Sequence, residues 1–211
     1  MKASVFVGTS LDGFIARADG SFDFLPAEVE PHGYEEFMAT VDALVIGRKT
    51  FETALGFDEW AYGKKPVFVL SSRSIATAPP GAVVEQMSGA PADIVSQLEA
   101  RGIQNIYVDG GLTIQRFLQA GLIHRLIITR VPVLIGTGIP LFGPLQRDIS
   151  SNMSPLAIFP AALFRVSMLL PPNKRLKLAG GDRSKGIGVL CPGEHGLSST
   201  TLAPAGGSPA A

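Results

Sequence analysis

The stretch Tyr107-Val108-Asp109-Gly110-Gly111-Leu112-Thr113-Ile114 decides the fold, because it joins a strand to a helix through a glycine pair. The largely apolar residues 103–108 predict a buried strand. Apolar residues then recur at i, i+3, i+4 and i+8, the spacing of one helix face: Ile114, Phe117, Leu118 and Leu122. Glycines let a ligand approach the backbone, and the first N–H groups of a helix attract anions. The turn therefore fits an anion site, with a tight connection that binds nothing as the plainer alternative.

Composition excludes several classes of protein. The chain has 211 residues, 46% of them hydrophobic, with zero formal net charge, so it can bury a sizeable core and offers no basic stripe for nucleic acid. One cysteine, Cys191, allows no intrachain disulfide, and the three histidines lie too far apart to suggest a metal site. No apolar run is long enough to span a membrane, and the first residues do not resemble a signal peptide. We therefore expect a soluble, cytoplasmic protein without a bound metal.

Predicted strands alternate with predicted helices along the first two thirds of the chain. The strands are expected at 3–9, 43–46, 66–70, 83–84, 103–108 and 126–134, and the helices at 33–40, 47–52, 92–100 and from 114 onward. A spacing of roughly 20 residues between strands is typical of an α/β domain with a mainly parallel sheet.

Three predicted strand ends carry groups that suit phosphate. Gly47, Arg48, Lys49 and Thr50 open a helix with two cations and a hydroxyl, although the helix dipole disfavours cations there. Ser71, Ser72 and Arg73 follow the next strand, and Gly110 and Gly111 follow a third. Ligands of open parallel sheets bind outside the carboxyl ends of the strands, so these groups can meet. Taken separately they are equally explained as solvated side chains and polar turns. Together they favour a dinucleotide with an extra phosphate, NADPH rather than NADH.

Five segments of the chain resemble one known family. Residues 10–16, 45–52, 69–73, 108–111 and 131–142 are similar, in order, to motifs of dihydrofolate-reductase-like proteins. The nearest branch is the C-terminal reductase domain of the bifunctional riboflavin-biosynthesis deaminase-reductase, with its stand-alone relatives. The resemblance covers about residues 1–148, and the segment from 122 to 142 is its most specific part.

The resemblance implies a mixed, mostly parallel sheet of about eight strands flanked by helices, with NADPH as hydride donor. Arg48, Lys49 and Thr50, after Gly47, would bind the 2′-phosphate and pyrophosphate. Ser71, Ser72 and Arg73 would surround the 2′-phosphate. Gly110, Gly111, Leu112 and Thr113 would line the pyrophosphate. The loop from 10 to 16 would cover the nicotinamide, with Asp12 and Gly13 as the catalytic residues near the reacting carbon.

The resemblance also implies an activity. The chain would transfer a hydride from NADPH to a pterin- or aminopyrimidine-like heterocycle, as 5-amino-6-(5-phosphoribosylamino)uracil reductase does in riboflavin biosynthesis. Relatives are often homodimers, and neither a nucleic acid nor a membrane is expected as a partner. The alternative is an NADPH-binding module without turnover, disabled by an altered C-terminus.

The chain departs from the family in two places. Folate reductases use a carboxylate of the first helix as proton donor, but Glu35 and Glu36 do not match that place well, and Asp109 is interpreted as a polar group that ends a strand. The usual closing strand pair is not evident after residue 149. We therefore expect a reductase domain over 1–170 with one sheet edge unfilled, with residues 159–169 as a poor substitute strand as the alternative. Residues 171–211 contain 8 Gly and 5 Pro and no aromatic residue, which predicts a disordered tail that replaced the family's usual ending.

Overall fold

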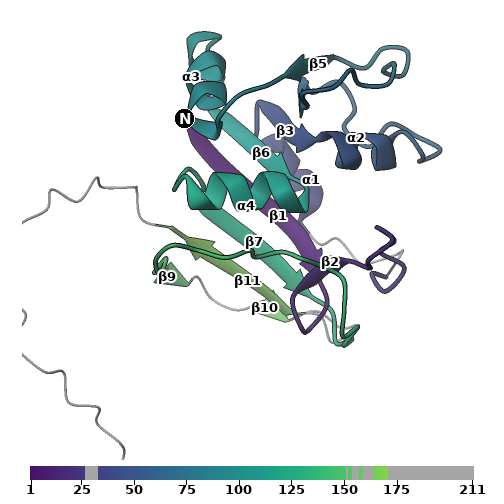
Figure 1. Cartoon of the computed structure of the whole chain (residues 1–211), viewed down its shortest axis with the longest axis vertical. Coiled ribbons are helices and arrows are strands. Elements are labelled where there is room, and N and C mark those ends of the chain that lie inside the picture. The colour runs from purple at the N-terminus through teal and green to yellow at the C-terminus, as the bar shows by residue number, and fades with distance from the viewer. Residues whose placement is uncertain (27–32, 151, 154–156, 159–163, 171–211) are drawn as a thin grey trace, which may run out of the picture. The chain divides into compact units, whose positions relative to one another are not determined.

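The main sheet of the computed structural model, which describes residues 1–26, 33–150, 152–153, 157–158 and 164–170, has a continuous run of seven strands (Figure 1). Their order across the sheet is β11 (Phe164–Leu169), β7 (Arg125–Arg130), β1 (Lys2–Thr9), β6 (Asn105–Asp109), β3 (Ala43–Gly47), β4 (Val67–Leu70) and β5 (Val84–Met87). The six strands from β7 to β5 run parallel to their neighbours, and β11 is antiparallel to β7. The expected α/β fold with a mixed, mostly parallel sheet is confirmed.

Four helices cover the two faces of this sheet. They are α1 (Tyr34–Ala39), α2 (Arg48–Ala54), α3 (Pro91–Ala100) and α4 (Gly111–Gln119). Helices α3 and α4 lie on the face turned toward the viewer in Figure 1 and bury Ile94, Ile114 and Phe117. Helices α1 and α2 bury Phe37 and Phe51 in a second core. Within the described part of the chain, every helix is too short or too polar to cross a membrane.

Alternation along the strands divides their side chains between the two cores. In β3, Ala43 and Val45 belong to the core under α3 and α4, whereas Leu44 and Ile46 belong to the core under α1 and α2. All four are fully buried. A strand covered on both faces needs apolar residues at every position, which explains the unbroken apolar runs in the sequence.

The C-terminal edge of the sheet corrects the sequence analysis. The expectation of an unfilled edge is wrong, because part of the possible substitute strand at 159–169 forms β11. It pairs with β7 over six residues, from Phe164 opposite Arg130 to Leu169 opposite Arg125. The short strands β9 (Asn152–Met153) and β10 (Ala157–Ile158) pair antiparallel with the other side of β11. The sheet is therefore closed at this edge by an antiparallel addition. The disorder predicted for 171–211 falls outside the described residues.

A small two-stranded ribbon pairs residues 14–16, where the sequence predicts a short extended piece, with residues 139–140, where it predicts part of a glycine-rich turn. Strand β7 ends at Arg130 instead of continuing to Leu134, and Ile139–Pro140 (β8) pairs with Phe14–Ala16 (β2). The ribbon leans on the start of α4, because Ile15 and Ile139 both lie beside Gly111. It therefore covers the turn between β6 and α4.

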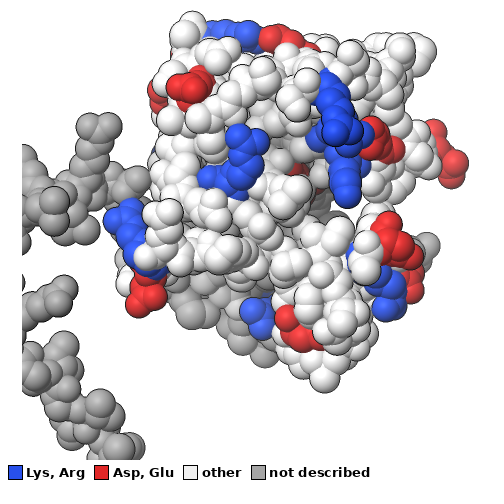
Figure 2. Space-filling view, in the orientation of Figure 1, with Lys and Arg blue, Asp and Glu red and all other residues white. Residues whose placement is uncertain are grey.

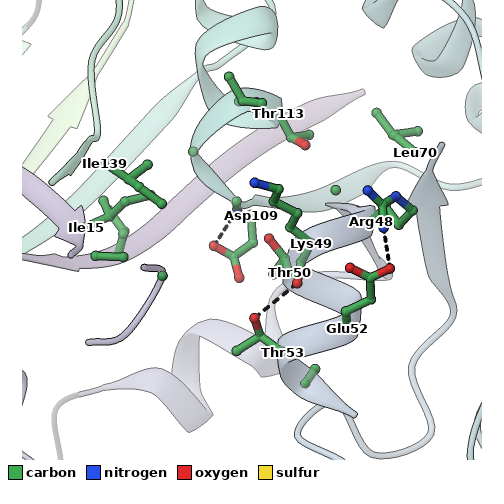
Figure 3. A pocket seen from close by; sticks show the side chains of 18 of the residues that line it. Ile15, Arg48, Lys49, Thr50, Glu52, Thr53, Leu70, Asp109, Thr113 and Ile139 are labelled. Carbon is green, nitrogen blue, oxygen red and sulfur yellow. Dashed lines mark hydrogen bonds and ion pairs between the residues drawn. The ribbon is translucent and has the colours of Figure 1, made fainter. Parts of the chain in front are cut away.

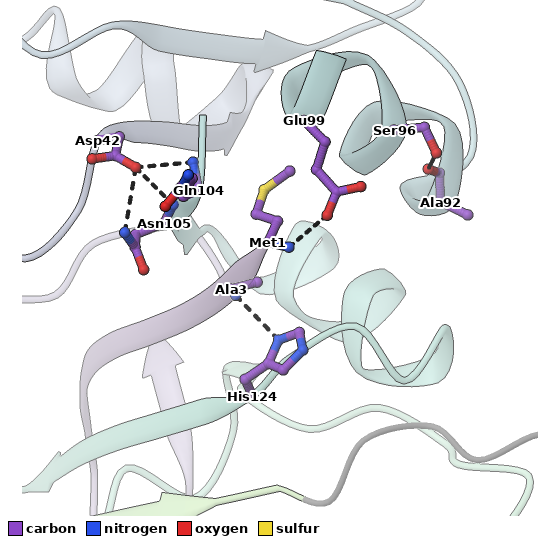
Figure 4. Close-up of polar contacts among 9 residues, drawn as sticks. All are labelled: Met1, Ala3, Asp42, Ala92, Ser96, Glu99, Gln104, Asn105 and His124. Carbon is purple, nitrogen blue, oxygen red and sulfur yellow. Dashed lines mark hydrogen bonds and ion pairs between the residues drawn. The ribbon is translucent and has the colours of Figure 1, made fainter. Parts of the chain in front are cut away.

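Polar contacts fix the strands at the end of the sheet away from that turn (Figure 4). One carboxylate oxygen of Asp42 accepts hydrogen bonds from the backbone N–H groups of Gln104 and Asn105, at 2.9 and 2.8 Å. These bonds lower the pKa of Asp42. The Ala3 N–H donates to Nδ1 of His124, 3.1 Å away. These contacts tie the start of β3 to that of β6 and the start of β1 to that of β7.

Two strand–helix turns pack against each other where β3 and β6 end. Gly110 has φ +90°, and a Cβ placed on it would lie 2.3 Å from Oγ1 of Thr50 in α2. A Cβ on Gly47 would lie 2.9 Å from Oγ1 of Thr113 in α4. Both approaches are closer than a methyl group allows, so each turn needs its glycine for packing as well as for any ligand.

Replacing Gly110 with alanine tests this packing. We expect Gly110→Ala to lower the free energy of unfolding by about 2–4 kcal/mol, since it adds a clash with Thr50 to the cost of a positive φ. Gly102→Ala is the matched control: its φ is +83°, but a Cβ there meets nothing within 4 Å. The control should lose only about 1–2 kcal/mol in urea unfolding.

A second substitution identifies the clashing atom. Thr50→Ala removes Oγ1 and should recover part of the loss in the Gly110→Ala background, because Cβ of Thr50 lies at an ordinary 3.4 Å. Equal losses for Gly110→Ala and Gly102→Ala, without recovery, would contradict the packing argument.

Candidate functional site

A cleft of about 1320 Å³ opens where the carboxyl ends of β1, β3, β4 and β6 meet. Figure 3 shows that side chains from α2, from the β6–α4 turn and from the β2–β8 ribbon surround it. All eleven residues predicted to bind the cofactor line this cleft: Gly47, Arg48, Lys49, Thr50, Ser71, Ser72, Arg73, Gly110, Gly111, Leu112 and Thr113. The three strand ends that the sequence singled out therefore form one site.

The β3–α2 turn supplies two cations. Arg48 and Lys49 occupy the first turn of α2, whose N-cap residue is Gly47, so no side chain caps the helix. The Arg48 guanidinium forms an ion pair with Glu52 one helical turn later. The Thr53 hydroxyl donates to the carbonyl oxygen of Lys49 at 3.0 Å. The Arg48 guanidinium is therefore already paired with a carboxylate, and a bound anion would compete with Glu52 for it.

The loop after β4 is shaped by its own hydrogen bonds. The Ser71 hydroxyl donates to the Arg73 carbonyl at 2.6 Å and accepts from the Arg73 N–H at 3.0 Å. The side-chain amide of Gln86, in β5, donates to the carbonyls of Ser71 and Arg73. The side chains of Ser72 and Arg73 are left exposed at the rim of the cleft. A hydroxyl and a guanidinium held this way suit a monoester phosphate.

The β6–α4 turn supplies a helix N-terminus. Helix α4 begins without a side-chain cap on Gly110, so its first N–H groups can serve an anion. Thr113 is buried against the neighbouring turn, whereas Leu112 is 72% exposed and projects as an apolar side chain at the cleft wall. The turn therefore offers both polar backbone and an apolar surface to a ligand.

Asp12 and Gly13 are not brought to this cleft. The Asp12 carboxylate accepts hydrogen bonds from the Ser10 hydroxyl at 2.6 Å and from the N–H groups of Ile135 and Gly136. The Ser10 hydroxyl, followed by these N–H groups, lowers the pKa of Asp12. Gly13 accepts a bond from the Leu141 N–H at 3.0 Å. In the described geometry the two residues join the β1–β2 turn to the loop after β7, and their predicted catalytic role remains a prediction.

Asp109 is the functional candidate that the sequence analysis passed over. It lies at the end of β6, partly buried in the wall of the cleft, and accepts a hydrogen bond from the Gly110 N–H at 2.7 Å. Burial raises its pKa from an ordinary 3.8 to about 6, against the opposing effects of the Gly110 N–H and the Tyr107 hydroxyl. A carboxyl with this pKa can exchange a proton near neutral pH.

Three tyrosines surround Asp109. Burial, with the Asp109 charge as a second cause, raises the pKa of Tyr34 to about 12 and raises the pKa values of Tyr62 and Tyr107 further. The Tyr107 hydroxyl donates to the Phe6 carbonyl at 2.8 Å. The phenols therefore stay protonated. Strand periodicity places Tyr107 and Asp109 on the same face of β6, and this was the available signal for Asp109.

The first helix does not bring a carboxylate to the cleft. Glu35 and Glu36 lie in the first turn of α1, and neither lines the cleft. Burial lowers the pKa of Arg165 in β11, and the charge of Glu36 partly offsets this effect. The Arg165 guanidinium lies 5.0 Å from the centre of the Phe6 ring. Neither matches the folate-reductase proton donor, as the sequence analysis indicated.

Comparisons with known proteins agree with this fold. The family described as the RibD C-terminal domain matches residues 2–154. The Bacillus subtilis protein YwjB, which is uncharacterized, is 32% identical over 158 residues, covering 70% of this chain and 86% of its own. A solved structure from Shewanella sp. PV-4 is 39% identical, with a TM-score of 0.73, and the match covers 81% of this chain and 99% of that chain. Its name assigns that protein provisionally to riboflavin biosynthesis.

A bifunctional enzyme shares the fold at lower identity. The Thermotoga maritima diaminohydroxyphosphoribosylaminopyrimidine deaminase/5-amino-6-(5-phosphoribosylamino)uracil reductase matches at 16% identity with a TM-score of 0.60, over 81% of this chain and 56% of its own. The order of the strands, the cleft at their carboxyl ends and the family match lead to one conclusion: this chain belongs to the RibD C-terminal domain family of reductase-like proteins.

Proposed function

We propose that the protein is an NADPH-dependent reductase that transfers a hydride to a small planar heterocycle. The observation that carries the proposal is the single cleft that gathers two cations of α2, the Ser72–Arg73 pair, the N-terminus of α4 and Asp109. At about 1320 Å³ the cleft exceeds the usual range for one small ligand, about 300–1000 Å³, so a dinucleotide and a second molecule fit together.

The residues present fit a phosphorylated dinucleotide. Arg48, Lys49 and Arg73 supply positive charge, and the first N–H groups of α4 suit a pyrophosphate. Gly111 lets the β2–β8 ribbon pack closely over the start of α4, since a Cβ there would meet Ile15 at 2.9 Å. The residues Ser72 and Arg73 favour a ribose that carries a 2′-phosphate over one that carries a free hydroxyl.

When bound, NADPH would supply the hydride. The chain's own residues bind the two molecules side by side, exclude water with the β2–β8 ribbon and hold a proton on Asp109. Reduction of a ring C=N bond needs a proton at nitrogen as well as the hydride at carbon. Asp109, with a pKa of about 6, is the group of the cleft that can deliver it near neutral pH.

The alternative of NADPH binding without turnover had two grounds, the missing last strands and the lack of a convincing proton donor on the first helix. The first does not hold, because β11 pairs with β7 along its full length. The second stands for Glu35 and Glu36, neither of which lines the cleft. The riboflavin pathway, the cytoplasmic location and the homodimer expected from the sequence stay predictions.

Selectivity for NADPH over NADH tests the phosphate site. We expect Arg73→Gln to weaken NADPH binding by about ten- to a hundredfold, because a charged hydrogen bond contributes about 1.5–3 kcal/mol, and to change NADH binding less than about twofold. Fluorescence titration with both nucleotides measures the ratio. Arg101→Gln is the control, since Arg101 is exposed, outside the cleft and paired with Glu85. Equal weakening of both nucleotides by Arg73→Gln would contradict the site.

Removing the internal competitor of Arg48 should act in the opposite direction. Glu52→Gln frees the Arg48 guanidinium from its ion pair, so NADPH should bind about two- to fivefold more tightly, the range of an exposed pair. The same titration measures it. Weaker NADPH binding in Glu52→Gln would show that Glu52 itself contributes to holding the ligand.

The raised pKa of Asp109 can be tested without a substrate, through the pH dependence of the protein's stability. The raised pKa means that the folded state binds the proton more strongly than the unfolded chain, so this contribution to stability is present below about pH 4 and is lost as pH rises through about 6. Asparagine imitates the neutral carboxyl. We expect Asp109→Asn to be more stable than the unaltered protein at pH 7.5, by about 1–2 kcal/mol after allowance for partial exposure, and about equal at pH 4.5.

Thermal unfolding of both proteins at the two pH values measures this difference. The exposed Asp58→Asn, outside the cleft, controls for the loss of one negative charge. Turnover of any accepted substrate should fall about a hundredfold in Asp109→Asn. A variant less stable than the unaltered protein at pH 7.5 would contradict the buried, proton-binding carboxyl.

A further inference from the structure

Charge is divided between the two ends of the cleft. The cationic side chains among its described lining residues are Arg48, Lys49, Arg73 and Arg116. They belong to α2, to the loop after β4 and to α4, where Arg116 donates to the Gly89 carbonyl just beyond β5. In the strand order β1-β6-β3-β4-β5 all four lie on the β3–β5 side. Figure 2 shows basic side chains gathered beside the hollow on the side of α2.

The other end of the cleft, near β1 and β6, is aromatic and acidic. Phe6, Tyr62 and Tyr107 line it beneath Asp109. Phe22 and Phe57 project from the segments after β2 and after α2, with ring centroids 6.2 Å apart and ring planes at 83°. Both rings stay substantially exposed, at 38% and 46%, although they touch. Exposed rings inside a cleft offer flat apolar surface to a planar ligand.

Three further arginines of the described residues, in the loop after β2, in β7 and in β11, are engaged elsewhere. Arg17 forms a two-bond ion pair with Asp23. Arg130 donates to the Leu11 carbonyl at 3.2 Å. Arg165 lies against the Phe6 ring, and its Nε donates to the Thr129 hydroxyl at 3.2 Å. These three arginines are not among the lining residues of the cleft. Above about pH 6, a phosphate at the β1 end would therefore face the Asp109 carboxylate, with no cation among the described lining residues of that end. This like-charge arrangement selects against a phosphate.

We propose that the molecule bound beside the dinucleotide is a planar heterocycle without a phosphate group, packed against Phe22 and Phe57 with a ring nitrogen toward Asp109. This inference rests on the proposed function, because it assigns the β3–β5 end to the dinucleotide. It separates this protein from a reductase of phosphoribosyl substrates such as the bifunctional enzyme named above.

Calorimetric titration of matched ligand pairs tests the inference. The full-length protein, saturated with NADP⁺ so that no hydride can move, is titrated with riboflavin against flavin mononucleotide and with neopterin against neopterin phosphate. We expect the phosphate-free member of at least one pair to bind, and its phosphorylated partner to bind at least about tenfold more weakly. Asp109→Asn should reduce the difference in affinity between the phosphate-free and the phosphorylated ligand, and the charge control Asp58→Asn should leave that difference unchanged.

An aromatic variant tests the second half of the inference. Phe57→Ala should weaken binding of the phosphate-free ligand by about five- to tenfold. Phe142→Ala, with a similarly exposed ring outside the cleft, should not.

Three results would overturn the inference. The first is that the phosphorylated ligands bind as tightly as their phosphate-free partners, or more tightly. Loss of that binding in Arg165→Gln would then show that the phosphate lies on Arg165. The second is that neither ligand of either pair binds to protein that has taken up NADP⁺. This result would disprove the proposed substrate class but leave the dinucleotide site intact. Failure to bind NADP⁺ or NADPH removes the proposed function itself, and the inference with it.

Discussion

The contact between the β3–α2 and β6–α4 turns is the constraint on which the rest of the site depends. Parallel neighbours β3 and β6 bring the two turns together, and the missing side chains of Gly47 and Gly110 let Thr113 and Thr50 fill the space. The same contact aims two helix N-termini at one cleft. A sheet with larger residues at these positions would have to separate the turns, and the cations of α2 would move away from the start of α4.

Much of this arrangement was predictable from the sequence because burial on both faces leaves a strong pattern. The runs at 43–46 and 66–70 are apolar at every position, as a doubly covered parallel strand requires. Once the strands are parallel, their carboxyl ends must share one edge of the sheet, so polar groups that follow three strands gather without further information. That rule brought the eleven predicted residues to one cleft, while what they bind is a matter for experiment.

The parts that the sequence did not reveal depend on contacts between distant segments. Strand β11 lacks an unbroken apolar run, and its pairing with β7 joins residues about 40 positions apart. Asp12 resembles a catalytic carboxylate in its local motif, yet the N–H groups that it binds come from residues 135 and 136. Asp109 looks like an ordinary end of a strand until Tyr34, Tyr62 and Tyr107 are placed around it. Local patterns describe none of these neighbours.

The central position of β1 has a consequence for how the chain acquires its structure. This strand is the first in the sequence, but its two neighbours are β6 and β7, more than 100 residues later. During synthesis its apolar residues, Val5 and Phe6 among them, stay without their partners until residue 130 has been made. Such distant pairing slows folding and lengthens the time in which an unpaired apolar strand can associate with other chains. We therefore expect the time needed to complete the chain to affect the protein's yield in a cell, in addition to the stability of the finished sheet.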